Sequence, residues 1–190
     1  TDNYVSVILG DNFFYGSGLI SLFEQASIVT EGAACFSYSV SDPQRYAVID
    51  SDGLGNINSI DEKPKYPKSN FVVPGFYFFD PSVIERAQDL KQSTNGQCEI
   101  TSLLKSYLSD NQLNCINMGR GFTWLDMGTI ESLYEATSFV RVLEIRQGMK
   151  ISCPEEIAWR NKWIDNEKLY SIAKSNNQNG YGRYLYQLLK

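Results

Sequence analysis

Histidine is missing from all 190 residues of the sequence. Because an imidazole carries the proton in Ser-His-Asp and Cys-His sites, both kinds of nucleophilic catalysis are excluded within this chain. Positive charge is also in short supply, since 17 Lys and Arg stand against 22 Asp and Glu and give a formal net charge of −5. This balance argues against a broad nucleic-acid surface. It leaves open a small phosphorylated ligand, which one or two well-placed cations can hold.

Paired cysteines and long hydrophobic runs are lacking too. Without a C-x-x-C pair a zinc ribbon is disfavoured, and in a chain of this size we expect reduced, mostly buried thiols. No apolar run approaches about 20 residues and no signal peptide is visible, so we expect no membrane partner and a cytoplasmic protein. The cysteines are Cys35, Cys98, Cys115 and Cys153.

The residues that are present predict a globular α/β protein. Hydrophobic residues make up 43% of the chain and charged residues 21%, which is enough for one sizeable core. Residues 4–9 form an apolar run typical of a strand buried on both faces. A helical stripe at 18–29 and a second apolar run at 33–40 follow. Strand, helix and strand with short joints predict a βαβ crossover in a parallel or mixed sheet.

Turn residues separate the elements predicted further along. Residues 46–50 and 57–63 flank a D-G-L-G-N turn and predict a hairpin. Residues 71–80 predict a strand that Pro74 and Gly75 interrupt, through a bulge or a close backbone approach. The other predicted elements are helices at 81–90, 99–108, 130–147 and beyond 154, a short strand at 113–118 and a loop at 119–129.

Two aspartates are the first candidate site residues. Asp11 follows the first strand, and ligands gather at the carboxyl ends of strands in open α/β sheets. Asp126 precedes the long predicted helix. Each carboxylate has an alternative role in shaping a turn or capping a helix. If the two converge, they form a hard-oxygen site for Mg²⁺, which prefers one or two carboxylates with water and phosphate.

The E-K-P tripeptide places an acid and a cation in a stiffened loop. Lys63 is a candidate point charge for a phosphate, and Glu62 a candidate acceptor for sugar hydroxyls. The alternative is a solvated hairpin end, because lysines are usually exposed.

Three further side chains have two alternative roles each. Tyr77 and Trp124 are candidates for stacking on a sugar or base, whereas most aromatic residues in strands belong to the core. Arg160 follows Glu156 by four residues, so it either grips an anionic ligand or forms an i,i+4 surface pair.

Four stretches of the sequence, in matching order and spacing, resemble the glucose-1-phosphate thymidylyltransferases. The L-G-D-N and E-K-P motifs are common to many sugar nucleotidyltransferases. The C-P-E-E-I-A-W-R stretch and the G-Y-G-x-Y-L ending are typical of the thymidylyl branch. The four stretches are LGDNFFYGSGL at 9–19, SIDEKPKYPKSNFVVPGFYFFD at 59–80, GRGFTWLDMGT at 119–129 and CPEEIAWRNKWID at 153–165.

The resemblance implies a fold and a division of roles. We expect a mixed, mainly parallel sheet flanked by helices, of the Rossmann-like nucleotide-diphospho-sugar transferase type, with a helical C-terminal tail. Residues 1–149 would form the sugar-phosphate and metal half, and residues 150–190 a regulatory and oligomerisation tail. The family's leading G-x-G-T-R-L loop, which holds the nucleotide triphosphate, is not in the sequence. We therefore expect an N-terminally truncated chain that is inactive alone and has the missing part as a partner.

Matching positions imply roles for individual residues. Asp11 and Asp126 would bind Mg²⁺, and with Lys63, which contacts the phosphate, they would form the catalytic set. Asn12, Ala47, Glu62 and Val73 would line the sugar pocket, and Tyr77 is the candidate stacking residue beside them. A second nucleotide site, where the end product regulates a homotetramer, would use Tyr15, Gly16, Cys153, Glu156, Ile157 and Arg160.

The sequence departs from the family at four positions. Ala47 replaces a usual glycine, so an extra methyl group would crowd the glucose. Asn95 replaces an arginine, which removes a phosphate contact. Met127 and Ser17 stand where Thr and His are frequent. The two metal carboxylates are intact.

The implied reaction transfers a thymidylyl group from dTTP to glucose 1-phosphate, giving dTDP-glucose for the dTDP-rhamnose and lipopolysaccharide pathways. One alternative is a related transferase that uses UTP or another sugar phosphate. Another is a non-catalytic paralogue that binds nucleotide sugars. A purely structural α/β domain would require several ordered motifs to match by accident.

Overall fold

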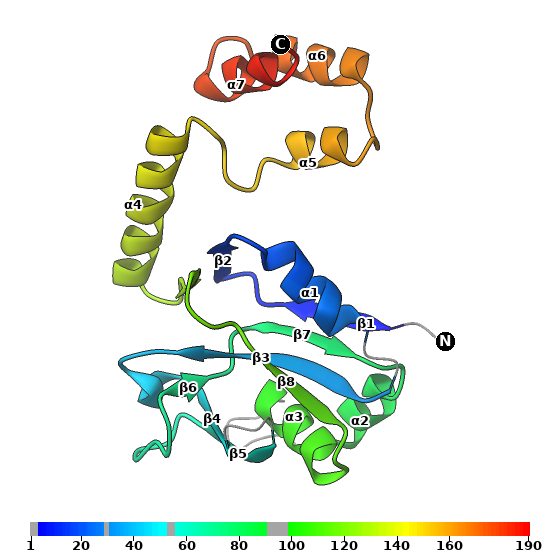
Figure 1. Ribbon diagram of the computed structural model, residues 1–190, viewed down its shortest axis with the longest axis vertical. Helices are drawn as coiled ribbons and strands as arrows, with labels where there is room; N and C mark the ends of the chain where they lie inside the picture. Colours follow the sequence, from blue (N-terminus) through cyan, green and yellow to red (C-terminus); the bar gives the residue numbers. More distant parts are fainter. Residues whose placement is uncertain (1–3, 29–30, 53–55, 91–98) are drawn as a thin grey trace. The chain divides into compact units, whose positions relative to one another are not determined.

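A computed structural model describes residues 4–28, 31–52, 56–90 and 99–190 (Figure 1). The chain divides into two compact units, Thr1–Gly128 and Thr129–Lys190. The first unit combines strands and helices, and the second contains helices within its described residues. The expected mixed α/β architecture with a helical C-terminal region is confirmed. The division of roles expected at residue 149 stays a prediction.

The first unit is built on one seven-stranded sheet in the order β1-β7-β3-β6-β4-β5, with β8 pairing β3. The sheet is mixed, but the expectation that it is mainly parallel was wrong. Among the described strands only β3 and β8 pair in parallel. The reason is that β7 lies between β1 and β3 and is antiparallel to both. The strands are β1 (Val5–Ile8), β3 (Ala33–Ser39), β4 (Ala47–Ser51), β5 (Ile57–Glu62), β6 (Phe71–Val72), β7 (Phe76–Phe79) and β8 (Leu113–Asn117).

A second, two-stranded sheet pairs β2 (Asn12–Gly16) with β9 (Phe122–Asp126) in antiparallel register. The sequence pattern missed both strands, since residues 119–129 were expected to form a loop. Each strand is five residues long, and its partner is more than 100 positions away, so no local pattern reveals the pairing.

Helices cover the large sheet of the first unit (Figure 1). One hydrophobic cluster joins the predicted apolar stripe of α1, with buried Ala26, to Phe36 and Met118. Another joins Leu103, Leu104 and Tyr107 of α3 to residues of β3, β5 and β7. The helices are α1 (Leu19–Ser27), the short η1 (Pro43–Arg45), α2 (Val83–Asp89) and α3 (Ile100–Ser109).

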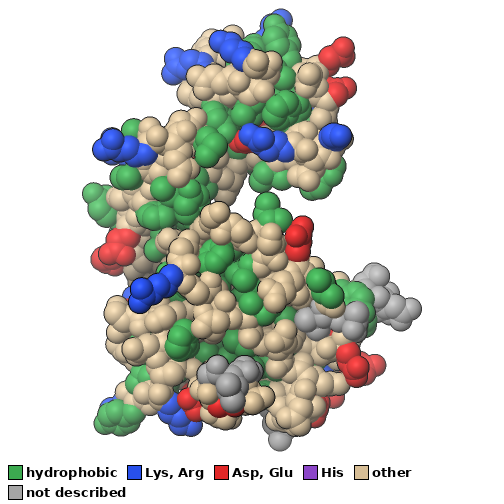
Figure 2. All heavy atoms as spheres, in the orientation of Figure 1, with side chains coloured by type: hydrophobic (Ala, Val, Ile, Leu, Met, Phe, Trp, Pro, Cys, Tyr) green, Lys and Arg blue, Asp and Glu red, His purple; other side chains and the backbone are tan. Residues whose placement is uncertain are grey.

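The second unit contains α4 (Ile130–Gln147), α5 (Pro154–Arg160), α6 (Asn166–Ser175) and α7 (Gly180–Leu188). Thr129 caps α4 through a capping box with Ser132, and α4 has the bounds predicted for this helix. Around buried Leu169 and Leu185, α5, α6 and α7 share a core of their own. None of the helices in the described ranges has the length and apolar character that a membrane span requires. Figure 2 shows charged side chains of both signs scattered over the visible surface of each unit.

Candidate active site

Asp11 and Asp126 lie at the same end of the two-stranded sheet. The register of β2 and β9 pairs Asn12 with Asp126, and Asp11 directly precedes Asn12. The backbone N–H of Met127 donates to the carbonyl oxygen of Asp11 at 2.8 Å. The pKa of the half-buried Asp126 is raised, first by burial and then by the negative charge of Asp11. The fold thus brings together two carboxylates that are 115 positions apart in the sequence, close enough to repel each other.

Asn12 fixes this end of the sheet by satisfying three partners at once. Its Nδ2 donates to Asp11 Oδ1 at 2.8 Å. Its Oδ1 accepts from the Gly75 backbone N–H at 2.9 Å and from Trp124 Nε1 at 2.7 Å. Trp124 is only 7% exposed and packs in the core. This agrees with the alternative interpretation, in which it is a core aromatic residue and not a stacking residue. The sequence offered no signal for this network, because its members are 63 and 112 positions from Asn12.

The predicted close backbone approach at Pro74 and Gly75 is confirmed. The interruption separates β6 from β7, and the backbone of Gly75 runs against Leu9 and Asn12. A Cβ added at Gly75 would lie 2.6 Å from Leu9 Cδ1 and 2.8 Å from Asn12 Oδ1. Glycine is therefore required for Asn12 to hold its position beside Asp11.

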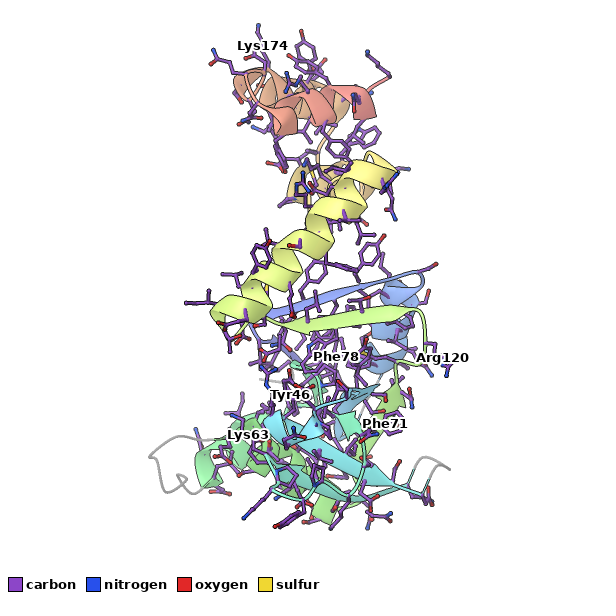
Figure 3. All side chains as sticks on the ribbon, turned by 90° about the vertical axis from the view of Figure 1, so that its left-hand side faces the viewer. Tyr46, Lys63, Phe71, Phe78, Arg120 and Lys174 are labelled. Atoms are coloured by element: carbon purple, nitrogen blue, oxygen red, sulfur yellow. The ribbon has the colours of Figure 1, made fainter. Side chains whose placement is uncertain are left out.

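Lys63 stands at the end of β5, within electrostatic reach of the carboxylate pair. Its backbone adopts a left-handed φ of 42°, and its N–H donates to the Tyr46 carbonyl at 3.0 Å. Figure 3 shows Lys63 close to Tyr46. The side chain of Lys63 is 67% exposed, and its Nζ lies 3.9 Å from Glu62 Oε1. Its positive charge lowers the pKa of Asp126, against the larger effects of burial and of Asp11.

Three of the expected sugar-pocket residues meet around β4. Ala47 is the register partner of Glu62, and its carbonyl accepts from the Val73 N–H at 2.9 Å. Glu62 also accepts a hydrogen bond from the hydroxyl of buried Thr101. This contact fixes the direction of the Glu62 carboxylate.

Tyr77 lies in the core. It is 3% exposed, and its ring stacks on Phe79 with a centroid distance of 6.1 Å. Burial, followed by the charges of Cys35 and Glu62, raises the pKa of its hydroxyl well above the ordinary value. Stacking on a ligand would require this ring to leave the core.

Arg45 is a residue near the carboxylate pair that the sequence reasoning did not single out. It ends η1, and its charge lowers the pKa of Asp126, against burial and the Asp11 charge. The available signal was its place in the R-Y-A-V run, directly ahead of the strand that pairs with Glu62.

The expected regulatory residues belong to two different units. Tyr15 and Gly16 lie in β2 of the first unit. A Cβ at Gly16 would come within 2.4 Å of Phe122 Cδ1, so glycine serves the strand pairing there.

The other four lie at α5 in the second unit. Cys153 is 3% exposed and precedes the helix, with its Sγ 3.1 Å from the Tyr181 hydroxyl. Ile157 is half exposed. Arg160 Nε donates to Glu156 Oε1 at 2.7 Å, which is the i,i+4 pair of its alternative reading. Arg160 also lines an open groove of about 800 Å³ within this unit.

The donor chemistry of the aspartate pair fits Mg²⁺. Among the described residues no group of three or more His, Cys, Asp or Glu could hold a metal ion. Magnesium needs no such cage, because it takes one or two carboxylates and fills its remaining positions with water and phosphate oxygens. Two convergent, partly exposed carboxylates that repel each other meet this requirement.

Comparison with known proteins identifies the fold family. The profile of the nucleotidyl transferase family, described as "Nucleotidyl transferase", matches residues 1–142. The chain belongs to this family. A solved Bacillus anthracis structure, described as a glucose-1-phosphate thymidylyltransferase in complex with sucrose, is 36% identical with a TM-score of 0.66. The similarity covers 74% of this chain and 55% of that one. An apo UDP-glucose pyrophosphorylase at 22% identity and a TM-score of 0.61 shares the fold, over 73% of this chain and 54% of its own.

Two curated relatives narrow the comparison within the nucleotidyl transferase family. A Neisseria meningitidis protein named glucose-1-phosphate thymidylyltransferase is 46% identical over 186 residues, which is 98% of this chain and 65% of the relative. A Mycolicibacterium smegmatis protein of the same name is 47% identical over 188 residues, 97% of this chain and 64% of the relative. The nucleotidyl transferase chain thus spans just under two thirds of these relatives.

Proposed function

We propose that the protein carrying these residues transfers a thymidylyl group from dTTP to glucose 1-phosphate, releasing pyrophosphate and dTDP-glucose. The observation that carries the proposal is the convergence of Asp11 and Asp126 within reach of Lys63. The names of relatives at 46% and 47% identity support the choice of nucleotide and sugar.

Thymidylyl transfer requires the protein to position the substrates and to stabilise charge, and it requires no general base. A phosphate oxygen of glucose 1-phosphate attacks the α-phosphorus of dTTP in line, and the bond from that phosphorus to pyrophosphate breaks. The attacking oxygen is already anionic, so no proton has to be removed. A chain without histidine can therefore support the reaction.

Each residue of the site then has a role. Asp11 and Asp126 would hold Mg²⁺, which when bound supplies positive charge to phosphate oxygens. Lys63 would orient the attacking phosphate as a point charge. Glu62, Asn12, Ala47 and Val73 would surround the sugar, with the Glu62 carboxylate directed by Thr101.

Regulation and assembly are part of the proposal. Tyr15 and Gly16 of the first unit would bind the end product, and so would Cys153, Glu156, Ile157 and Arg160 of the second. The protein would be a cytoplasmic homotetramer of the dTDP-rhamnose and lipopolysaccharide pathways. The exposed Ile157 beside the Glu156–Arg160 pair supports a ligand-facing role for this end of α5.

The test is a nucleotide panel on the natural protein that carries this chain. Pyrophosphate release is measured with glucose 1-phosphate, Mg²⁺ and either dTTP or UTP. We expect release with dTTP to exceed release with UTP. Equal or faster release with UTP would contradict the thymidylyl assignment, and no release with either nucleotide would contradict the transferase assignment.

A further inference from the structure

Arg45 is held at two points and leaves the rest of its guanidinium group open. Its Nη1 donates to Asp42 Oδ2 at 3.1 Å, and its guanidinium carbon lies 5.3 Å from the centre of the Tyr46 ring. Its other N–H groups make no hydrogen bond with any residue in the described ranges. The side chain is 45% exposed. A guanidinium fixed in this way retains free donors in a set direction.

Two contacts of Tyr46 place this cation beside the site. The Tyr46 carbonyl accepts from the Lys63 N–H at 3.0 Å. The Tyr46 ring lies 5.0 Å from that of Trp124, which is two residues before Asp126 on β9 and so on the same face of the strand. Arg45 and Lys63 therefore approach the carboxylate pair from neighbouring elements.

Neither cation pairs with the carboxylates that it approaches. Arg45 forms its ion pair with Asp42, and Lys63 lies nearest Glu62. No ion pair joins either of them to Asp11 or Asp126 within 4.0 Å in the described part of the chain. The contacts of Tyr46 with Lys63 and Trp124 nevertheless keep both cations on the elements next to Asp126. The cations are thus near the carboxylates and separated from them, as a site for a metal-bound phosphate requires.

The other lysines on or beside β5 and residues 63–70 have partners of their own. Lys68 and Lys105 both lie within ion-pair distance of Asp61. Lys65 lies over the ring of Tyr66. Asn95, which the resemblance places where an arginine is usual, lies outside the described residues. Arg45 and Lys63 are the cations that the contacts of Tyr46 place beside the carboxylate pair.

We propose that Arg45 binds the phosphate of the sugar phosphate together with Lys63. The proposal rests on the proposed function, because only then does a sugar phosphate occupy this site. The planar guanidinium fork matches two phosphate oxygens, which a lysine cannot reproduce. The contacts with Asp42 and Tyr46 hold the fork before the ligand arrives and so reduce the entropy lost on binding.

The test measures ligand binding to the 190-residue chain by calorimetry and by NMR titration, in the presence of Mg²⁺. The ligands are glucose 1-phosphate and, as a probe without phosphate, glucose. The variants are Arg45→Ala, Arg45→Lys and Lys63→Ala. Arg120→Ala is the matched control, because Arg120 is an exposed arginine of the same unit near the opposite end of the β2–β9 pair.

We expect Arg45→Ala to weaken glucose 1-phosphate binding about 10- to 100-fold, the range for losing a charge-assisted contact. Glucose binding should not change. Arg45→Lys should restore part of the affinity, and Arg120→Ala should bind like the wild type. The amide spectrum and melting temperature of each variant confirm that it is folded.

Each contrary result points to a different failure. If Arg45→Ala binds glucose 1-phosphate as the wild type does while Lys63→Ala does not, the role of Arg45 is wrong and the proposed function stands. If Arg45→Ala weakens glucose binding equally, its effect is structural and the proposal is overturned. If the wild-type chain fails to bind glucose 1-phosphate with Mg²⁺, both the proposal and the sugar-phosphate assignment fall.

Discussion

Two carboxylates of this chain, Asp126 and Asp80, lie in opposite electrostatic surroundings. The surroundings predict a different role for each. Asp126 is disfavoured as an anion by burial and by Asp11, whereas Asp80 is buried with donors on every side. A carboxylate whose negative charge the fold does not stabilise is expected to bind a ligand. An anion that the fold satisfies is expected to serve stability.

The first prediction concerns Asp126→Asn in the natural protein. Pyrophosphate release should fall by about 100-fold or more, because the metal loses one of its two carboxylates. The free energy of unfolding should stay the same or rise slightly, since the repulsion from Asp11 is removed. Steady-state rates and urea denaturation measure the two quantities. Comparable losses of activity and stability would favour a structural role for Asp126.

The second prediction concerns Asp80→Asn and its pH dependence. Burial alone would raise the pKa of Asp80, but hydrogen bonds from the Ser82 side chain, the Gly32 N–H and the Tyr107 hydroxyl hold it below the ordinary value. A lowered folded-state pKa gives stability that is present above the unfolded value of about 3.9 and is lost as pH falls through the folded value. The variant should therefore be less stable by about 1–3 kcal/mol at pH 7, and the difference should shrink near pH 3.

Urea denaturation at the two pH values measures this difference. Asp89→Asn is the control, because Asp89 is an exposed carboxylate at the end of nearby α2. It should match the wild type at both pH values. A deficit for Asp80→Asn that persists unchanged at pH 3 would show that the contribution of the carboxylate does not depend on its charge.

At the scale of elements, sequence patterns predicted what local chemistry determines. The pairing of β4 with β5 was predicted from the turn sequence between them, of which residues 53–55 lie outside the described ranges. The bounds of α4 match the helix predicted at 130–147. The β2–β9 pair was missed, although it positions both aspartates that we propose hold Mg²⁺. Its register depends on contacts between distant segments, such as Trp124 with Asn12, which no window of sequence contains. Asp11 was predicted from its place after a strand, Asp126 from its place before a helix, and both from the resemblance. Arg45 was missed, although its contacts with Asp42 and Tyr46 are local.

The third prediction tests the junction between these elements through Gly75→Ala. The new methyl group would overlap Leu9 and the Asn12 side chain, so β7 and the start of β2 must move apart. We expect a loss of about 1–3 kcal/mol in unfolding free energy, as for an overpacked core position. Glucose 1-phosphate binding should weaken as well, since Asn12 also holds Asp11.

Gly10→Ala is the matched control for this junction. No atom lies within 4 Å of a Cβ built at Gly10, so its stability should equal that of the wild type. If Gly75→Ala melts at the same temperature as Gly10→Ala, the close approach at Gly75 does not constrain the fold.

At the scale of the whole molecule, binding and turnover are separable properties. The first unit gathers the carboxylate pair and the cations, and the second has its own helical core. The 190 residues do not include the G-x-G-T-R-L sequence that holds the nucleotide triphosphate in the family that the chain resembles. The fourth prediction is therefore that a polypeptide of these residues alone binds glucose 1-phosphate with Mg²⁺ but releases no pyrophosphate when dTTP is added.

A coupled pyrophosphate assay on the 190-residue polypeptide, run beside the natural protein that carries it, measures this separation. The physical reason is that in-line transfer needs the α-phosphorus of dTTP held within about 3–3.5 Å of the attacking oxygen, and the aspartates and cations of the first unit orient only the attacking side. Adding Asp126→Asn to the polypeptide should abolish metal-dependent binding while leaving the zero rate unchanged. Robust release by the polypeptide would show instead that these residues also hold the triphosphate, and Arg45 and Lys63 would then have to be tested as ligands of dTTP.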